Sequence, residues 1–473
     1  MFSFDYVVLN AFLKENFDFL VGARIQKVQQ PTRQELILSI RKNSETKKLY
    51  ININPQFCHI CFMSKENEKL RGIEIPQKPP MFCMQLRKYI ENALITRVNQ
   101  PENERIFEIF IETYSELGEK IELCLASEFM GRHSNIILYN ADTNIILGCA
   151  HNVGADKSCV REVIGGLPYI YPPKNNYTPP KNDCTAKPDN INDFIDTYFA
   201  KKIAENNLKS LRSQLANLVQ KQITGLEKQC DLIKKSLKSD ENYAKYKHYG
   251  DLIMANLYNL KDFTSSVTLF DYENDCEIML ETDENLKASE NAQKFYKKYT
   301  KIKKRVEKNS EILEEYIQKL DYLKNVLYFI ENSENIENLN EIKQEILPQN
   351  KTKQDVNQKS SKNFSITETE INGHKVFIGK NNKQNDYIVS KLAKDEDYWF
   401  HVQNATGSHV LLKCAEPDDK TIYECAKLAK EFSSAKNSTK AGVIYTKAKH
   451  LKRPPNTPLG YVTYRSEREI VVN

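Results

Sequence analysis

The chain lacks the features that would place it in a membrane or outside the cell. Among its 473 residues, no apolar run approaches the roughly 20 residues that a membrane-spanning helix needs. Residues 1–5 have neither the basic start nor the apolar stretch of a secretion signal. The eleven cysteines form no framework pattern, and their odd number fits reduced thiols. These absences predict a cytoplasmic protein with no membrane partner.

Motifs for metals, cofactors or catalysis are equally sparse. The one CxxC, Cys58 to Cys61, has no second pair and lies in a strand-like stretch, so we expect it to pack in a core. Asp395, Glu396 and Asp397 could hold a metal in a nuclease. Neighbouring residues of a strand point to alternate faces, however, so we expect these carboxylates to cap and orient a loop. We predict no catalytic residue, no metal and no cofactor.

Charge and length indicate a multidomain protein with basic surfaces. Charged residues make up 28% of the chain, and its length is typical of about three domains. The formal net charge is only +5. From Ile366 onward there are 17 Lys and Arg against 13 Asp and Glu, so most of this excess belongs to the C-terminal part.

Residues 1–174 have the pattern of a mixed α/β domain. Apolar spacing predicts a helix from Asp5 to Asn16 and a proline-started helix from Pro79 to Lys88. We predict strands at Arg24–Gln29, Glu35–Arg41 and Tyr50–Ile53. Residues 131–135 read as a loop that leads into a strand, and its Arg132 and His133 fit phosphate contacts and plain solvation equally well.

The apolar spacing of residues 175–350 predicts a helical middle region. A polar connector with prolines, residues 175–187, precedes a helix from Leu208 to Leu237, and a second helix with a continuous heptad seam runs from Tyr299 to Ile330. Two such helices separated by a compact insert predict an antiparallel coiled-coil arm. Residues 351–365 are polar and are predicted to be a flexible linker.

Eight cations between Lys294 and Lys308 open the second helix of this arm. Such a run is usually a solvated face of a coiled coil. Aromatic residues interleave with it, however, and clustered Lys and Arg suit the phosphates of structured RNA. We therefore predict RNA contacts by Lys297, Lys301, Lys304 and Lys308.

The signature stretch, residues 381–412, contains the only tryptophan, Trp399, and two of the eight histidines. We predict strands at Tyr398–Val402 and Val410–Leu412, joined by a tight Gly-Ser turn in which Gly407 allows a positive φ. In the same domain, residues 366–473, we expect a helix at Ile422–Phe432, a strand at Val443–Thr446, and a final strand pair formed by Gly460–Tyr464 and Ile470–Val472.

Three pieces of the signature stretch, Asn-Asn-Lys-Gln-Asn-Asp, Asp-x-Trp-Phe-His and Gly-Ser-His-Val, resemble the C-terminal signature of the NFACT family in order and spacing. Residues 22–41, 79–88, 128–138 and 161–173 resemble its N-terminal blocks, and residues 248–292 resemble its middle region. The resemblance implies a multidomain α+β fold. Its parts would be a mixed α/β N-terminal domain, a long antiparallel coiled-coil arm with a helix-hairpin-helix-like insert, and a small α+β C-terminal domain.

The resemblance also implies a function. Such a factor is not an enzyme but acts in ribosome quality control, on a large ribosomal subunit that still carries peptidyl-tRNA. It brings an aminoacylated transfer RNA, alanyl in bacterial relatives, to the acceptor site, and the ribosome adds an untemplated C-terminal tail. The implied partners are ribosomal RNA, transfer RNA, the nascent chain and a small RNA-binding translocation factor.

Candidate site residues follow from the residues and the resemblance together. Where the family carries an Asp-Arg pair that helps to hold transfer RNA, this chain has Glu104 and Arg105, which could alternatively form a surface ion pair. The candidate transfer-RNA site is Glu104, Arg105, Arg87, Arg132 and His133. The candidate ribosome contacts in the signature stretch are Asn385, Asp397, Trp399, His401, Gly407, Ser408 and His409. Trp399 and one of the histidines are equally compatible with a core role.

Two further functions compete with this interpretation. A glycosylase of the formamidopyrimidine type would need an N-terminal proline amine and zinc-finger cysteines, whereas this chain has Phe2 and Ser3 after Met1. A fibronectin-binding surface adhesin would need an export signal. We therefore hold adhesion as a secondary activity at best.

Overall fold

The computed structural model describes residues 2–114, 118–156, 158, 160–173, 190–347, 366–455 and 457–473. The chain forms two compact units, Met1–Asn207 and Leu208–Asn473. Within the described residues, no helix combines the length and apolarity needed to cross a bilayer. The predicted connector at 175–187 and linker at 351–365 lie outside the described residues.

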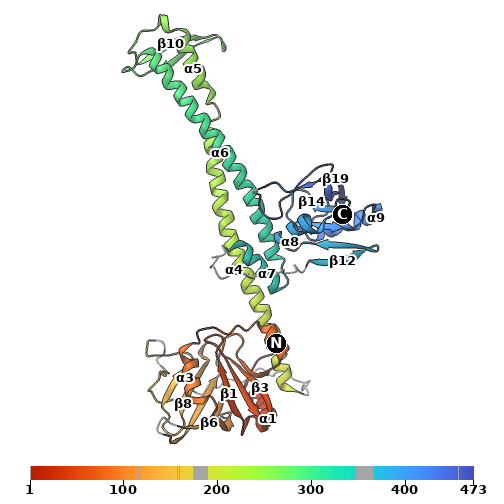
Figure 1. Ribbon diagram of the computed structural model, residues 1–473. Helices are drawn as coiled ribbons and strands as arrows, with labels where there is room; N and C mark the ends of the chain where they lie inside the picture. The colour runs from red at the N-terminus through yellow and green to blue at the C-terminus, as the bar shows by residue number, and fades with distance from the viewer. Residues whose placement is uncertain are drawn as a thin grey trace. The chain divides into compact units, whose positions relative to one another are not determined.

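The first unit is built on a nine-stranded antiparallel sheet with the order β4-β3-β2-β1-β5-β6-β7-β8-β9 (Figure 1). Its helices are α1 (Tyr6–Leu20), α2 (Lys65–Arg71) and α3 (Met81–Ile90). Its strands are β1 (Arg24–Gln29), β2 (Glu35–Lys42), β3 (Glu45–Asn52), β4 (His59–Met63), β5 (Leu94–Asn99), β6 (Ile106–Tyr114), β7 (Lys120–Glu128), β8 (Asn135–Asn140) and β9 (Ile146–Cys149). The predicted helices and strands of this domain are confirmed, with shifted ends.

Local chemistry explains where α1 begins and ends. The Asp5 carboxylate accepts the backbone N–H groups of Val7 and Val8 at 3.0 and 2.9 Å, which caps the first turn. The helix ends before Gly22, whose φ of +82° suits a residue without Cβ. Phe12, on the inner face of the helix, is fully buried in the core of the unit.

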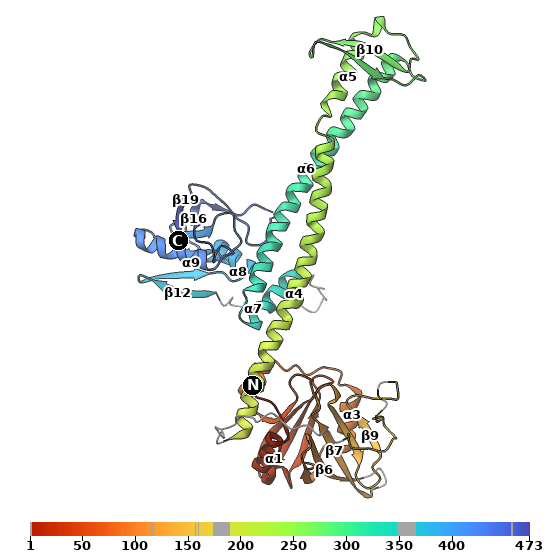
Figure 2. The ribbon, with the colours of Figure 1, turned by 180° about the vertical axis from the view of Figure 1, so that it is seen from behind.

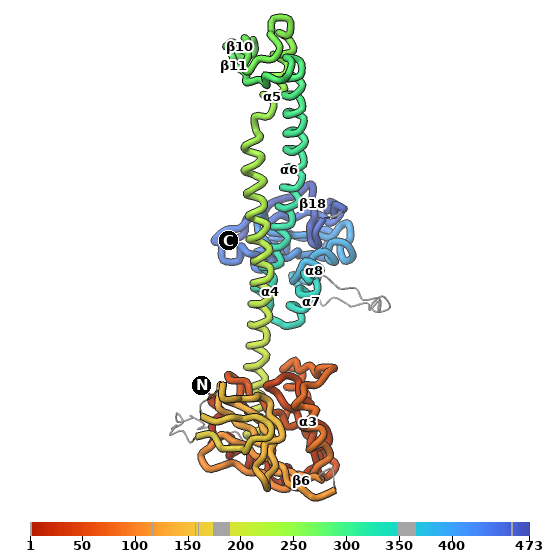
Figure 3. The backbone as a smooth tube through the Cα atoms, turned by 90° about the vertical axis from the view of Figure 1, so that its left-hand side faces the viewer, coloured from red at the N-terminus to blue at the C-terminus, as the bar shows by residue number. Residues whose placement is uncertain are grey.

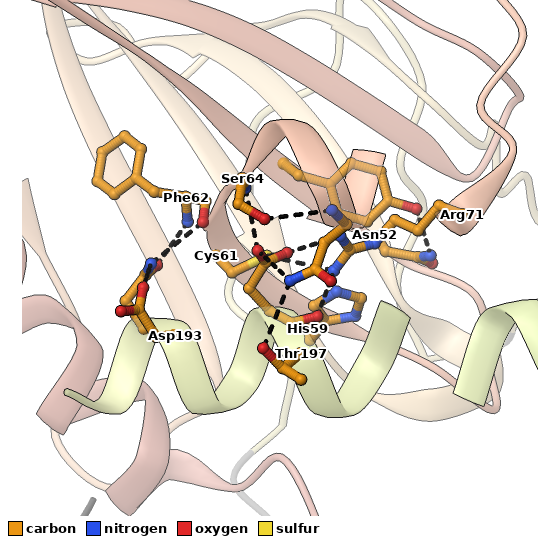
Figure 4. Close-up of polar contacts among 12 residues, drawn as sticks. Asn52, His59, Cys61, Phe62, Ser64, Arg71, Asp193 and Thr197 are labelled. Carbon is orange, nitrogen blue, oxygen red and sulfur yellow. Dashed lines mark hydrogen bonds and ion pairs between the residues drawn. The ribbon is translucent and has the colours of Figure 1, made fainter. Parts of the chain in front are cut away.

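A buried polar network fixes the start of α4 (Ile191–Ser239) to this sheet (Figure 4). The Asp196 carboxylate accepts hydrogen bonds from Arg71 Nη1 at 2.6 Å, from the Ser64 backbone N–H at 3.0 Å and from Asn67 Nδ2 at 2.7 Å. Both side chains of the Arg71–Asp196 pair are almost completely buried. The first turns of α4 therefore belong to the first unit, and this helix begins 17 residues before the predicted Leu208.

The second unit contains the predicted antiparallel arm. Helices α4 and α6 (Ala288–Glu331) run side by side in Figures 1 and 3. Polar contacts along the pair fix the antiparallel register: Asp240 with Arg305, Glu227 with Lys324, and Arg212 with Ser333. Apolar residues three and four apart fill the seam: Leu215, Val219, Ile223, Leu320, Leu323 and Ile330.

The insert between the two arm helices differs in one element from the helix-hairpin-helix-like arrangement that we expected. Helix α5 (Ala244–Ala255) is followed by the two-stranded hairpin β10 (Ser266–Asp271) and β11 (Cys276–Glu281), and the chain then enters α6. Alternating Val267 and Leu269 on β10 face a small apolar core with α5 and α6. Helix α7 (Ile336–Ile346) follows α6 and completes the base of the arm.

The C-terminal domain is a six-stranded antiparallel sheet with the order β12-β13-β15-β14-β16-β19, and Figure 2 shows α9 beside it. Its strands are β12 (Thr367–Ile371), β13 (His374–Ile378), β14 (Tyr398–Val402), β15 (Val410–Leu412), β16 (Ala441–Lys447) and β19 (Arg468–Val472). Its helices are α8 (Asn382–Tyr387), which continues into a π-helical turn, and α9 (Asp419–Glu431).

Two predictions for this domain are wrong. The proposed final strand pair does not form, because β18 (Thr463–Tyr464) pairs with β17 (Leu451–Lys452) while β19 pairs with β16. The connection between β14 and β15 is also longer than a tight turn: it runs from Gln403 to His409. Gly407 lacks a positive φ and instead forms a bridge to Ser433 at the end of α9.

Candidate nucleic-acid interface

Four of the five predicted transfer-RNA residues come together in the first unit. Glu104, Arg105, Arg132 and His133 line one cavity of about 600 Å³. They come from two loops that are distant in sequence, one entering β6 and one entering β8. The sheet brings the loops together because β6 pairs with β7 and β7 pairs with β8.

Backbone contacts hold both loops in place. The Glu104 N–H donates to the Pro101 carbonyl at 3.1 Å, and the Phe129 N–H donates to the Arg105 carbonyl at 2.9 Å. In the second loop, the Met130 N–H donates to Ser134 Oγ at 2.8 Å. The candidate side chains therefore project from anchored turns.

Two arginines at the cavity can contact an anion. Arg105 and Arg132 line it together with the carboxylates of Asp5 and Glu104, whereas the charge of Arg161 is balanced by Glu128. The Asp5 carboxylate already caps α1. Arg132 and His133 are exposed, so they can reach a ligand larger than the cavity itself. Guanidinium groups bind phosphate with two parallel hydrogen bonds, which suits a nucleic-acid backbone.

One wall of this cavity rests on a network that the sequence prediction missed. Arg161 forms an ion pair with the fully buried Glu128, and Tyr169 donates its hydroxyl to the same carboxylate at 2.9 Å. Burial raises the pKa of Glu128, while the Arg161 guanidinium opposes that shift. Nearby, Tyr171 donates to the buried Glu108 at 2.5 Å. The sequence does hold a signal for this network, since Tyr169 and Tyr171 follow Arg161 in a loop that contains prolines.

Arg87, the fifth candidate, does not line the cavity. It is half-buried on α3, and its Nε donates to the Val28 carbonyl at 3.0 Å. The sequence named this side chain only as a candidate contact for transfer RNA. The observed hydrogen bond instead ties α3 to β1, which gives Arg87 a structural contact.

The four arm lysines that we predicted to contact RNA lie on the surface of α6. Lys297, Lys301, Lys304 and Lys308 are all exposed on α6, and no carboxylate of the described residues lies within 4.0 Å of their Nζ atoms. Arg305, in contrast, forms a bidentate pair with Asp240. The four lysines are therefore available to phosphate.

The signature stretch is mostly buried, which does not fit a set of surface contacts with the ribosome. Asn385, Trp399, Ser408 and His409 are at most 4% exposed, and Gly407 is also buried. A Cβ on Gly407 would lie 2.7 Å from Ser433 Cβ, so the glycine allows the chain itself to pack closely.

Asp397 also has a structural contact, in agreement with the expected loop-capping role. Its carboxylate accepts the Lys394 backbone N–H at 2.7 Å and pairs with Lys413 Nζ at 2.6 Å. Its neighbour Glu396 pairs with Lys447 and Lys449, and these lysines lower the pKa of Glu396 to about 2. Among the described residues, no cluster of His, Cys, Asp or Glu could hold a metal ion.

The chain matches models of one protein family along most of its length. A model described as NFACT N-terminal and middle domains matches residues 5–188 and 181–364, and one described as NFACT protein RNA binding domain matches residues 363–465. The chain belongs to the NFACT family. The resemblance inferred from its sequence blocks is therefore confirmed.

Relatives of this NFACT chain match along its whole length. The Rqc2 homolog RqcH of Bacillus subtilis (strain 168) is 28% identical, over 99% of this chain and 98% of that protein. The Rqc2 homolog RqcH of Streptococcus pneumoniae serotype 2 is 26% identical over the same shares. A solved structure, the C-terminal part of the fibronectin/fibrinogen-binding protein from Streptococcus suis, is 25% identical with a TM-score of 0.44, over 56% of this chain and 95% of that one.

The NFACT models cover both regions described above. The cavity around Arg105 falls within the N-terminal match, and the signature stretch falls within the RNA-binding match. Family membership and the relatives together support a role in ribosome quality control through RNA binding.

Proposed function

We propose that this protein binds a large ribosomal subunit carrying peptidyl-tRNA and holds an aminoacylated transfer RNA, alanyl-tRNA by analogy with its family, for untemplated tailing of the nascent chain. It acts in the cytoplasm and leaves bond formation to the ribosome. The observation that carries the proposal is the meeting of Glu104, Arg105, Arg132 and His133 at one cavity.

The chemistry of the cavity supports a transfer RNA over a small metabolite. Its rim includes the exposed Arg132 and His133, so the binding surface continues outside the hollow. An RNA loop can place a base or phosphate inside while its backbone meets the rim. Glu104 retains the carboxylate of the family's Asp but extends one methylene further. This difference affects which transfer RNA is preferred more than whether RNA binds.

The test is copurification of RNA with the full chain. Arg132→Ala removes an exposed guanidinium, so the fold should survive, and Arg105→Ala removes the one deeper in the cavity. Charge-assisted hydrogen bonds of about 1.5–3 kcal/mol correspond to an affinity loss of roughly 10- to 100-fold. We expect both variants to lose transfer RNA while they still sediment with large subunits.

Arg41→Ala is the matched control, because Arg41 is an exposed arginine on β2 that does not line the cavity. Sequencing of the copurified RNA identifies the transfer RNA and hence the amino acid. Retention of transfer RNA by both cavity variants would contradict the proposed site. Enrichment of a transfer RNA other than the alanine type would contradict alanyl tailing alone.

A further inference from the structure

A second cavity lies in the C-terminal unit and is independent of the one around Arg105. It has a volume of about 870 Å³ and is lined by Trp399, His401, His409 and Tyr464, together with Asp321 and Asn325 of α6. A cavity of this size can hold a ligand as large as a nucleoside. Its aromatic members belong to the signature stretch and to β18.

The rings in this cavity are arranged as a stacking platform. The Trp399 and His401 rings are stacked, with centroids 5.8 Å apart and planes within 8°. The ring centroid of Tyr464 lies 5.9 Å from that of Trp399, and Tyr464 is 39% exposed, so it forms the open side of the platform. Such aromatic faces accept unpaired bases in proteins that bind single-stranded RNA.

Three polar atoms at the cavity lack hydrogen-bond partners among the described residues. They are Trp399 Nε1, His409 Nδ1 and Asn325 Oδ1, and all three are buried. An indole N–H is only a donor and an amide oxygen only an acceptor. A buried polar atom without a hydrogen bond is unfavourable. The edge of a base carries both donors and acceptors, so it could form hydrogen bonds with these three atoms.

The charges of the cavity argue against a phosphate. Of the described residues that line it, Asp321 and Lys324 are charged, and Lys324 Nζ forms an ion pair with Glu227 Oε1 at 3.7 Å. Burial lowers the pKa of His401 to about 4 and also lowers that of His409, so both imidazoles are neutral near pH 7. A neutral aromatic site beside a carboxylate therefore suits a base more than a phosphate.

We propose that this cavity binds one unpaired nucleobase of RNA, stacked on Tyr464 and hydrogen-bonded inside the cavity. The inference rests on the RNA binding proposed for the protein and adds the contact that its C-terminal domain makes. The signature stretch then acts by building the cavity, which reconciles its burial with RNA binding.

The single tryptophan makes the inference testable in the full-length protein. A short oligouridylate RNA should quench Trp399 fluorescence on binding, whereas an abasic oligomer of the same length and charge should not. Tyr464→Ala should weaken binding of the oligouridylate roughly tenfold, as expected for the loss of one stacking contact. Tyr114→Ala is the matched control, because Tyr114 is also exposed and lies in the other unit.

The measurement separates this inference from the general RNA-binding proposal. Fluorescence anisotropy of labelled RNA reports binding anywhere on the protein, while quenching reports this cavity. Binding without quenching, or equal quenching by the abasic oligomer, would overturn the base site and leave the transfer-RNA proposal intact. Quenching that is lost in Tyr464→Ala supports the base site, and unchanged affinity in Tyr464→Ala would overturn it. Repeating the titration with transfer RNA and with large subunits shows which RNA supplies the base.

Discussion

Asn385 Oδ1 accepts a hydrogen bond from the backbone N–H of His409 at 3.0 Å. This bond joins α8 to the start of β15 inside the domain, and Asn385 Nδ2 also reaches the Gly407 carbonyl at 3.4 Å. Gly379 packs against this side chain, and a Cβ added at Gly379 would lie 2.1 Å from Asn385 Oδ1. Asn385 therefore organises the signature stretch from within.

Replacement of Asn385 should accordingly affect folding first. Asn385→Ala leaves the buried His409 N–H without its acceptor, so we expect a loss of about 1–3 kcal/mol in the free energy of unfolding. Urea titration followed by Trp399 fluorescence measures it. Asn437→Ala, at an exposed position of the same domain that does not line the cavity around Trp399, should change little. Full stability of Asn385→Ala together with lost RNA binding would mean that Asn385 is a ligand contact.

Two glycines should respond oppositely to alanine. A Cβ on Gly407 would meet Ser433 and the Phe432 carbonyl at 2.7 and 3.1 Å, so Gly407→Ala should destabilise the C-terminal domain. Gly225 lies inside α4 with nothing within 4 Å of a new Cβ, so Gly225→Ala should stabilise the arm by about 0.5–1 kcal/mol. Thermal melts by circular dichroism at a helical wavelength and by Trp399 fluorescence distinguish the two regions. A stabilised Gly407→Ala would contradict the packing argument.

These glycines show what the sequence could and could not reveal. Periodicity predicted the arm and the strands β1, β2 and β3 of the first unit, because burial on one face leaves a regular apolar pattern. The role of Gly407 depends on contact with Ser433, which is 26 positions later and carries no local signal. Motif residues likewise named four side chains that line the cavity around Arg105, whereas its Glu128–Arg161 support needed the tertiary fold.

The C-terminal domain should lose stability in mild acid. Burial lowers the pKa of folded His401 to about 4, below its ordinary value near 6.5. The neutral imidazole therefore contributes stability that is present above pH 6.5 and is lost as the pH falls toward 4, by up to about 1.4 kcal/mol per pH unit. Urea titrations across this window, followed by Trp399 fluorescence, should show a smaller pH dependence in His401→Gln. Identical slopes would exclude His401 as the source.

Ribosome association should depend on the exposed lysines of α6. Replacing Lys297, Lys301, Lys304 and Lys308 with Glu reverses four charges and should release the protein from large subunits in sedimentation at moderate salt. The matched control reverses four exposed lysines of α4: Lys221, Lys228, Lys234 and Lys235. We expect the control to remain bound. Equal release by both sets would mean that net charge alone determines binding, and no release by the α6 set would make the arm a spacer.

The buried pair of Arg71 and Asp196 should control how firmly α4 is attached to the first sheet. Asp196→Ala leaves an uncompensated guanidinium in the interior, so we expect a local destabilisation of about 3–5 kcal/mol. Hydrogen exchange of peptides from β4 and α2 measures the effect where the Asp196 contacts lie. The double variant Arg71→Met/Asp196→Leu removes both charges and keeps apolar volume, so it should exchange more slowly than the single variant. Faster exchange in the double variant would show that the polar network itself, and not the isolated charge, holds the helix.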